Sequence, residues 1–259
     1  MNALPFRLDR SIVIGARRET VFGFFTDDAR WARWWGAGST IDACVGGRVY
    51  IRYPGNVEVS GEVLEIAPPD RIVFSYGYET GTPFGPGESR VTITLEAQGK
   101  GTRLRLAHEF AEAAPCVEHV QGWRFQLSLF ANVIADEVHV GAADATDDWF
   151  RAWAEPDPDA RRALLLRIAE PDISFRDRYS MIDGVDELSL HIGAAQRFMP
   201  GIRMERRGAI RHTQGTVLAD WVALTKDGQA AMQGINVFLF GANGKIESAT
   251  GLVSPPQTP

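Results

Sequence analysis

Residues 117–138 (VEHVQGWRFQLSLFANVIADEV) form the longest helical pattern in the chain. No proline interrupts this segment, and Gly122 is its one weak helix former. A stripe of apolar side chains this long must be buried, so we expect residues 1–116, which are rich in strand patterns, to form a sheet that closes around the helix. The stripe follows from steps of three and four residues and consists of Val120, Trp123, Leu127, Phe130, Ala131, Ile134 and Val138.

A second apolar set lies on nearly the opposite side of the same helix and consists of Phe125, Leu129 and Val133. Two interpretations are open for this set. A second domain or a partner subunit covers it, or the three side chains lie singly on the surface, as apolar residues often do.

The composition is that of an ordinary globular chain, with 45% hydrophobic and 23% charged residues among 259. A net charge of −6 argues against nucleic acid or an anionic membrane as the main partner. No run of about 18 apolar residues predicts a membrane span, and the first residues do not resemble a secretory signal. The cysteines, Cys44 and Cys116, have no metal-ligand spacing, so we expect a reducing cytoplasm.

The first half of the sequence alternates strand and turn signals. Residues 7–14 predict a strand and residues 17–26 a short helix, followed by a tryptophan-rich segment, WARWWGAG. Further strands are predicted at 47–53, 57–66 and 71–78, and a hairpin at 90–96 and 102–108 around AQGKG.

Five segments in this order carry a family resemblance: ETVFGFFTD, WARWWG, GEVLEIAPPDRIVFSY, GTRLRLAHEF and GWRFQLSLF. The first half resembles the SRPBCC (START-like) superfamily, and within it the branch named after the activator of the heat-shock chaperone ATPase. The resemblance implies a helix-grip fold over residues 1–140, in which a curved antiparallel sheet wraps a long helix and leaves a cavity. Members bind lipids, polyketides or other apolar small molecules.

The second half begins after a weakly patterned segment, residues 139–146, where we place the domain boundary. Helices are predicted at 147–154, from Pro158 or Asp159 onward, and at 185–199, with a short strand at 173–177. Long strands joined by turns follow, and Asp-Gly and Asn-Gly dipeptides indicate hairpins among them.

This order resembles the SnoaL-like branch of the nuclear transport factor two superfamily, and the segments that carry it are WFRAW, ISFRDRY, GVDELSLHI and GINVFLFGANGKI. The resemblance implies a cone-shaped α+β barrel over residues 144–254, with a pocket at its open end and a homodimer through this domain. Relatives include isomerases, polyketide cyclases, epoxide hydrolases and plain binding modules. The predicted fold class of the whole chain is therefore α+β, in two different domains.

The sequence lacks the short motifs that mark well-known catalytic, metal-binding and cofactor-binding sites. It holds no GxSxG, HExxH, CxxC, GxGxxG or phosphate-binding loop, and its five histidines have no metal-ligand spacing. We therefore expect neither a metal nor another cofactor.

The candidates for ligand contact in the first half are aromatic. Tyrosine and tryptophan bury a large apolar area and also carry a polar group, so they suit the wall of a cavity for a largely apolar ligand. Plain core packing is the alternative for each of them. The candidates are Trp34, Trp35, Tyr53, Phe74, Tyr76 and Trp123.

The second half offers one set for acid–base chemistry. His191 suits proton transfer because a histidine pKa lies near neutrality, Asp177 would orient it, and Tyr179 would donate a hydrogen bond. The alternative is that His191 is a structural histidine. Strand alternation points three further candidates, Trp221, Asn236 and Phe238, into the cone. SnoaL-like relatives often carry Asp at the position of Asn236, and an amide cannot act as a base.

Two functional hypotheses remain. In the first, the protein binds or transforms a small, largely apolar metabolite, with any metal-independent acid–base chemistry in the second domain. In the second, it is a binding or interaction module without turnover, regulatory or associated with a chaperone. A hydrogen bond between His191 and Asp177 inside a closed cavity would favour the first.

Overall fold

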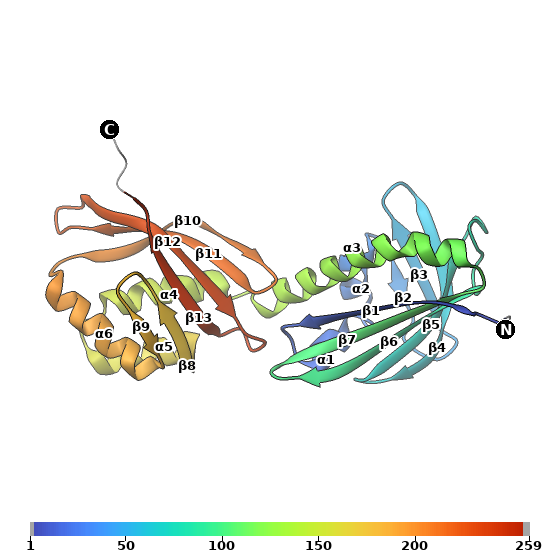
Figure 1. Cartoon of the computed structure of the whole chain (residues 1–259), viewed down its shortest axis with the longest axis horizontal. Coiled ribbons are helices and arrows are strands. Elements are labelled where there is room, and N and C mark those ends of the chain that lie inside the picture. The colour runs from blue at the N-terminus through green and yellow to red at the C-terminus, as the bar shows by residue number, and fades with distance from the viewer. Residues whose placement is uncertain (1–2, 256–259) are drawn as a thin grey trace. The chain divides into compact units, whose positions relative to one another are not determined.

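The structure, a computed structural model, describes residues 3–255. Contacts within it divide the chain into two compact units, Met1–Ala135 and Asp136–Pro259, each described here by itself (Figure 1). Each unit combines one sheet with helices, which confirms the α+β class. That the units are separate domains with boundaries near residues 140 and 144 stays a prediction.

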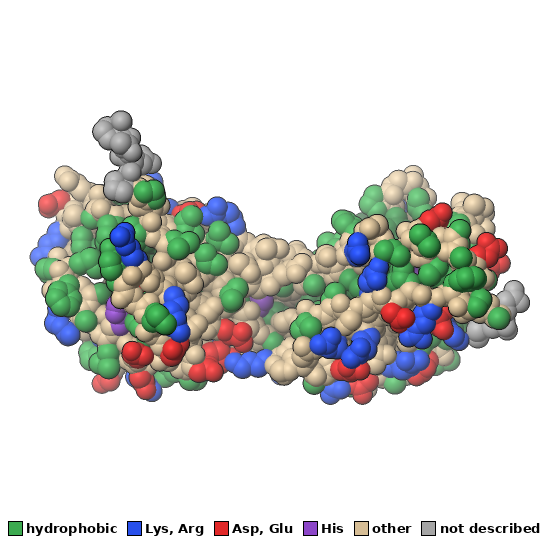
Figure 2. Space-filling model, viewed as in Figure 1, with side chains coloured by type: hydrophobic (Ala, Val, Ile, Leu, Met, Phe, Trp, Pro, Cys, Tyr) green, Lys and Arg blue, Asp and Glu red, His purple; other side chains and the backbone are tan. Residues whose placement is uncertain are grey.

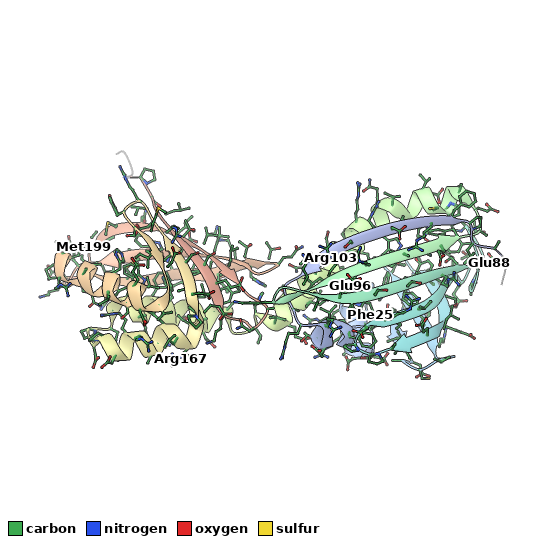
Figure 3. The ribbon with its side chains drawn as sticks, turned by 60° about the horizontal axis from the view of Figure 1, so that its bottom comes forward. Phe25, Glu88, Glu96, Arg103, Arg167 and Met199 are labelled. Carbon is green, nitrogen blue, oxygen red and sulfur yellow. The ribbon has the colours of Figure 1, made fainter. Side chains whose placement is uncertain are left out.

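The first unit contains a seven-stranded sheet in the order β1-β7-β6-β5-β4-β3-β2 (Figure 1). Neighbouring strands pair antiparallel throughout. The predicted hairpin around AQGKG joins β6 to β7, where Glu96 pairs with Arg103 (Figure 3). The strands are β1 (Phe6–Ile14), β2 (Thr40–Ile41), β3 (Arg48–Tyr53), β4 (Val57–Ala67), β5 (Arg71–Tyr78), β6 (Ser89–Gln98) and β7 (Gly101–Phe110).

Helix α3 (Ala113–Val138) confirms the predicted long helix, and its part within the first unit lies across one face of this sheet (Figure 1). Trp123, Leu127, Phe130, Ala131 and Ile134 of the predicted stripe are buried, while the residues at its two ends are half-buried. The helix that most constrains the fold therefore buries the face that its periodicity predicts.

The second apolar set on α3 has a mixed outcome. Phe125 is exposed, Leu129 is half-buried and Val133 is buried. Arg33 on α2 (Asp28–Trp35) donates a hydrogen bond to the carbonyl oxygen of Val133 at 2.9 Å, so α2 reaches this part of the helix. Phe125 thus agrees with the surface interpretation, whereas the neighbour identified for Val133 is α2 of the same unit.

Aromatic side chains from α2 and the residues after α1 (Arg18–Gly23) fill the space between α3 and the sheet. The ring of Phe25 lies 5.8 Å from that of Trp34 and 5.1 Å from that of Phe130, measured between centroids (Figure 3 labels Phe25). Trp31 and Trp34 are also fully buried. Asp27 caps α2 by accepting a hydrogen bond from the backbone N–H of Arg30.

The second unit contains a six-stranded sheet in the order β10-β11-β12-β13-β8-β9, in which β13 and β8 pair parallel. Three helices pack with it: α4 (Ala142–Ala154), α5 (Pro158–Ile168) and α6 (Val185–Phe198) (Figure 1). The strands are β8 (Ala169–Arg176), β9 (Met181–Asp183), β10 (Arg203–Thr213), β11 (Thr216–Leu224), β12 (Ala230–Phe240) and β13 (Ile246–Val253).

One local prediction here is wrong. The sequence predicts that a helix begins at residue 147, after the weakly patterned residues 139–146, but α4 already begins at Ala142. Alanine is the strongest helix former, and a helix face made of small residues gives little hydrophobic pattern. His139, just before this helix, is buried.

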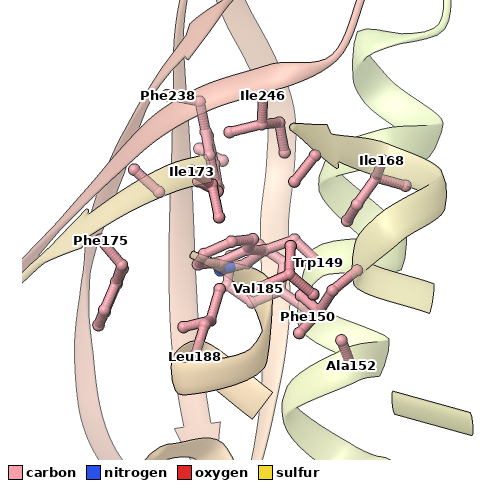
Figure 4. Close-up of a cluster of buried hydrophobic side chains, with 14 of the residues drawn as sticks. Trp149, Phe150, Ala152, Ile168, Ile173, Phe175, Val185, Leu188, Phe238 and Ile246 are labelled. Carbon is pink, nitrogen blue, oxygen red and sulfur yellow. The ribbon is translucent and has the colours of Figure 1, made fainter. Parts of the chain in front are cut away.

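A cluster of buried side chains forms the core of the second unit (Figure 4). Trp149 of α4 packs against Phe175 of β8 and Phe238 of β12, with ring centroids 5.8 and 5.4 Å apart. Trp221 of β11 and Asn236 and Phe238 of β12, which alternation predicts to point inward, are buried. The other residues on the same strand faces are buried too: Val217, Ala219 and Ala223 on β11, and Gly234 and Phe240 on β12.

The loop 79–88 of the first unit packs directly on β5, because Gly77 has no side chain. A Cβ atom at residue 77 would lie 1.8 Å from the carbonyl oxygen of Gly85. The same contact region includes a hydrogen bond of 2.9 Å from the N–H of Tyr78 to the carbonyl of Phe84. Gly77 thus fixes the position of a loop that contributes to the site described below.

We predict that Gly77→Ala lowers the free energy of unfolding by about 1–3 kcal/mol, the usual cost of overpacking. Gly15→Ala is the matched control, because nothing lies within 4 Å of a Cβ atom there, and it should change stability by less than about 0.5 kcal/mol. Chemical denaturation of both variants measures this difference. Equal stabilities would contradict the close packing of the loop on β5.

Candidate functional site

The first unit holds a pocket of about 430 Å³ between α3 and the sheet. Its wall combines side chains from α2, β3, β4, β5, the loop 79–88 and α3. One side is open, because Glu118, Gly122 and Phe125 of α3 are exposed. The lining residues are Trp35, Tyr53, Val57, Tyr76, Tyr78, Pro83, Glu118, His119, Gly122, Trp123, Phe125 and Gln126.

Aromatic rings stand nearly perpendicular to one another around this pocket. The ring of Trp35 lies 5.7 Å from that of Tyr53 at 85° and 5.7 Å from that of Trp123 at 74°. Tyr76 and Tyr78, two residues apart on β5, make a similar pair at 6.1 Å and 87°. Such edge-to-face packing stabilises the walls and fixes the orientation of each ring.

A first hydrogen-bond network connects polar groups of the pocket. The hydroxyl oxygens of Tyr53 and Tyr76 lie 3.2 Å apart. His119 Nδ1 lies 2.7 Å from the carbonyl oxygen of Pro115, which can only accept, so Nδ1 carries the proton. His119 Nε2 therefore accepts from the Tyr78 hydroxyl, at 3.3 Å.

A second network lies directly behind the first and is fully buried at His108 of β7. The indole N–H of Trp123 donates to His108 Nδ1 at 3.0 Å, so the ring proton must sit on Nε2. His108 Nε2 then donates to Ser89 Oγ at 2.9 Å, and Ser89 Oγ donates to the carbonyl of Tyr76 at 2.7 Å. This chain of donors holds Trp123 on the sheet only while His108 is neutral.

Burial controls the ionisation of these groups. It raises the pKa of Tyr53, of Tyr76 and of Tyr78, which keeps all three hydroxyls protonated at neutral pH. Burial also lowers the pKa of His119, and it lowers that of His108 well below its ordinary range. Glu118 is thus the one lining residue that bears a formal charge near neutral pH.

The six aromatic residues proposed as ligand contacts in the first unit divide into two groups. Trp35, Tyr53, Tyr76 and Trp123 line the pocket, and their contact with a ligand stays a prediction. Trp34 and Phe74 do not line this pocket and are fully buried among core side chains, and their contact with a ligand also stays a prediction. Trp34 follows the helical rotation away from Trp35 and packs 4.6 Å from Phe130, and Phe74 lies deeper on β5, 5.9 Å from Trp31.

The sequence did not identify the other lining residues as candidates, although strand alternation and one polar residue on an apolar helix face pointed to two of them. Tyr78 alternates with Tyr76 on β5, so the same face of the strand could have been extended to it. Gln126 interrupts the apolar face of α3 and is nonetheless buried, where its amide Nε2 donates to the carbonyl of Trp34. No sequence pattern marked Glu118 or His119 as a site residue, since exposed and half-buried polar residues are common in the first turns of a helix.

The structure does not assemble the predicted acid–base set of the second unit. His191 Nε2 lies 3.3 Å from Ser180 Oγ, whereas Asp177 accepts a hydrogen bond of 2.7 Å from the N–H of Tyr179. Among residues 3–255, no hydrogen bond joins His191 to Asp177. Tyr179 is 82% exposed, so it does not donate into a closed cavity. Asp177 instead stabilises its own turn, a common role for Asp two residues before a free N–H.

The three candidates predicted to point into the cone are buried, as expected, but Trp221 and Phe238 belong to a packed core (Figure 4 labels Phe238). Trp221 packs against Gly234, where an added Cβ would approach its ring to 2.5 Å. Asn236 is also buried, and its Oδ1 would lie 3.4 Å from a Cβ atom on Gly251. Ligand contact by these residues stays a prediction.

Within the part of the chain that the structure describes, no group of three or more His, Cys, Asp or Glu side chains is placed to hold a metal ion. None of the helices in residues 3–255 has the combined length and apolar character of a membrane span. Cys44 and Cys116 are free thiols.

Comparison with known families agrees with the resemblance of the first half. Residues 15–135 match the family model "Activator of Hsp90 ATPase homolog 1-like protein", a stretch that lies entirely within the first unit. This match confirms the predicted family for that stretch. No curated protein matches the sequence.

Solved structures similar to the chain each cover about half of it. A putative isomerase of the SnoaL-like family from Agrobacterium tumefaciens is 21% identical and aligns over 46% of this chain and 99% of its own, with a TM-score of 0.42. CalU16 from Micromonospora echinospora is 28% identical over 48% of this chain and 75% of its own, with a TM-score of 0.40. The Aha1 dimer from Colwellia psychrerythraea is 20% identical over 48% and 92%, with a TM-score of 0.41.

The buried neutral state of His108 predicts a specific loss of stability in acid. Burial lowers the pKa of His108 in the folded protein from an ordinary value of 6.5. Below pH 6.5, His108 therefore binds a proton in the unfolded chain but stays unprotonated in the folded protein. The free energy of unfolding should therefore fall as pH drops from 6.5, by up to about 1.4 kcal/mol per pH unit from this residue.

His108→Gln is the informative variant, because an amide can accept from Trp123 and donate to Ser89 without titrating. Urea denaturation at several pH values down to about 5 should show a shallower acid loss in His108→Gln than in the wild type. His119 and His139 contribute equally to both proteins. Parallel pH profiles for the two would contradict a buried, neutral His108.

Proposed function

We propose that the first unit is a binding module for a small, largely apolar molecule, and that its site is the pocket between α3 and the sheet. The observation that carries this proposal is the lining: rigid aromatic walls, a few tyrosine and histidine polar groups held neutral, and one exposed carboxylate. Volume supports it too, since 430 Å³ falls within the ~300–1,000 Å³ typical of small-molecule sites.

Gly122 gives independent support. A glycine inside a helix costs roughly 0.5–1 kcal/mol relative to alanine. Nothing lies within 4 Å of the place where a Cβ atom on Gly122 would stand, so packing does not require glycine there. Because Gly122 lines the pocket, a larger side chain here would occupy space at its open side, so the glycine keeps this side open at a cost in helix stability.

For the second unit we favour binding without turnover. No hydrogen bond joins His191 to Asp177 among residues 3–255, and Tyr179 is exposed, so the side chains proposed for an acid–base mechanism do not form a hydrogen-bonded set. The alternative of a non-catalytic binding or regulatory module is therefore the one that we favour. A cytoplasmic location is part of this proposal and agrees with the two free thiols.

We also propose that the second unit forms a homodimer through the outer face of its sheet. Leu239 of β12 and Leu252 of β13 are about half exposed, at 48% and 52%, on the face opposite the core. The register places the two leucines four residues apart on this face, since Leu239 pairs with Ser248 and Leu252 with Ile235. Exposed apolar side chains on one sheet face are a typical site of association. The SnoaL-like resemblance implies the same mode of assembly.

Ligand binding can be tested with Gly122→Leu, which should fill the pocket and weaken binding of the neutral, polarity-sensitive dye Prodan at least tenfold. Gln121→Leu, an exposed neighbour on α3, is the matched control and should bind like the wild type. Thermal unfolding should show Gly122→Leu to be as stable as the wild type or more so, because leucine favours the helix. Undiminished dye binding in the Gly122 variant would refute this site.

Sedimentation velocity at micromolar concentration tests the dimer. We expect the wild type to sediment as a dimer and the double variant Leu239→Glu, Leu252→Glu as a monomer, because buried like charges would oppose each other across the interface. Val45→Glu, at an exposed valine of the first unit, should leave the dimer intact. A monomeric wild type would exclude this assembly.

A further inference from the structure

The charge of the pocket is unusual for a site with so many aromatic side chains. Lysine and arginine are missing from its twelve lining residues, and its tyrosines and His119 are neutral near pH 7. Glu118 is exposed at the open side and forms no ion pair with any residue in the described part of the chain. The pocket therefore has a net negative charge with no fixed positive charge to balance it.

The aromatic walls reinforce the same preference. The face of an aromatic ring is negative and its edge positive, so a cation is attracted to the faces of Trp and Tyr. Neighbouring rings lie at 74–87° to one another, so their faces point in different directions and several rings can surround one ligand.

The polar groups of the pocket do not favour an anion or a strongly hydrogen-bonding ligand. The hydroxyl of Tyr78 donates to His119, and one of the hydroxyls of Tyr53 and Tyr76, which lie 3.2 Å apart, donates to the other. At most one of the three O–H donors is thus left for a ligand. Gln126 directs its amide N–H₂ to the carbonyl of Trp34. A ligand whose charge is shielded by alkyl groups needs few directed hydrogen bonds and suits these surroundings.

We propose that the pocket binds a small organic ammonium cation with an apolar body, its charge held by the aromatic faces and by Glu118. This inference rests on the proposed function and names the chemical class of the ligand for the same site. Trp35, Tyr53 and Trp123 form the aromatic part of the site. Glu118 balances the positive charge at the open side.

Isothermal titration calorimetry with a pair of isosteric probes tests the charge preference directly. Phenyltrimethylammonium and tert-butylbenzene have nearly the same shape, and only the first is charged. In phosphate buffer at pH 7.5, free of competing amines and at about 0.15 M salt to screen distant charges, the cation should bind at least tenfold more tightly than the hydrocarbon.

Glu118→Gln locates the effect. It should weaken binding of phenyltrimethylammonium about three- to tenfold and leave that of tert-butylbenzene unchanged, because the amide keeps the size of the side chain and removes its charge. Glu112→Gln, at an exposed carboxylate just before α3 that does not line the pocket, is the matched control and should bind both probes like the wild type.

Three outcomes would overturn this inference. Equal binding of the two probes, with both lost in Gly122→Leu, would refute the cation preference and leave the proposed binding site standing. Tighter binding of the cation that Glu118→Gln does not change would refute the role of the pocket carboxylate and with it the assignment. Binding of neither probe, together with Prodan binding that Gly122→Leu does not alter, would refute both the inference and the proposed function.

Discussion

The packing of α3 on the sheet of the first unit is the interaction on which the rest of that unit depends. Its apolar stripe buries Leu127, Phe130 and Ile134 among aromatic side chains, and such burial provides most of the stability of a helix in a folded protein. Polar groups fix the helix at Trp123, through the neutral ring of His108. The apolar contacts thus hold the helix on the sheet, and one buried hydrogen-bond chain sets its position there.

The pocket exists because this packing is incomplete toward the N-terminal half of α3. Between Glu118 and Gln126 the helix presents a glycine, a histidine and an exposed phenylalanine, whereas further along its inward face carries the buried Leu127, Phe130 and Ile134. Gly77 of β5 allows the loop 79–88 to close the other side. The small and polar residues at one end of the helix leave room for a ligand, and the apolar residues at the other end form the core.

Much of this fold could be predicted from sequence because periodicity reports burial. The helix at 117–138, the hairpin around AQGKG and the inward faces of β11 and β12 all follow from spacing alone. The composition of the pocket was less predictable. Trp34 and Trp35 are adjacent in sequence, yet one packs in the core and the other lines the pocket, because a helix turns about 100° per residue.

The hydrogen bonds of the proposed acid–base residues in the second unit were unpredictable for a different reason. Sequence places His191 and Asp177 near each other in the fold, but it does not show which hydrogen bond each one makes. The carboxylate of Asp177 accepts a hydrogen bond from the N–H of Tyr179 in its own turn, and His191 Nε2 lies within hydrogen-bond distance of Ser180 Oγ. Local bonds from Asp and Ser to nearby backbone often prevail over longer-range pairs, and they are the part of a site that spacing does not reveal.

The central claim, that the space beside α3 is where this protein binds its ligand, is tested most directly by NMR of the indole N–H groups of its seven tryptophans. Titration with phenyltrimethylammonium should shift the signals of Trp35 and Trp123 and leave those of Trp149 and Trp221 in place. Shifts confined to Trp149 and Trp221, with Trp35 and Trp123 unmoved at saturation, would contradict the account.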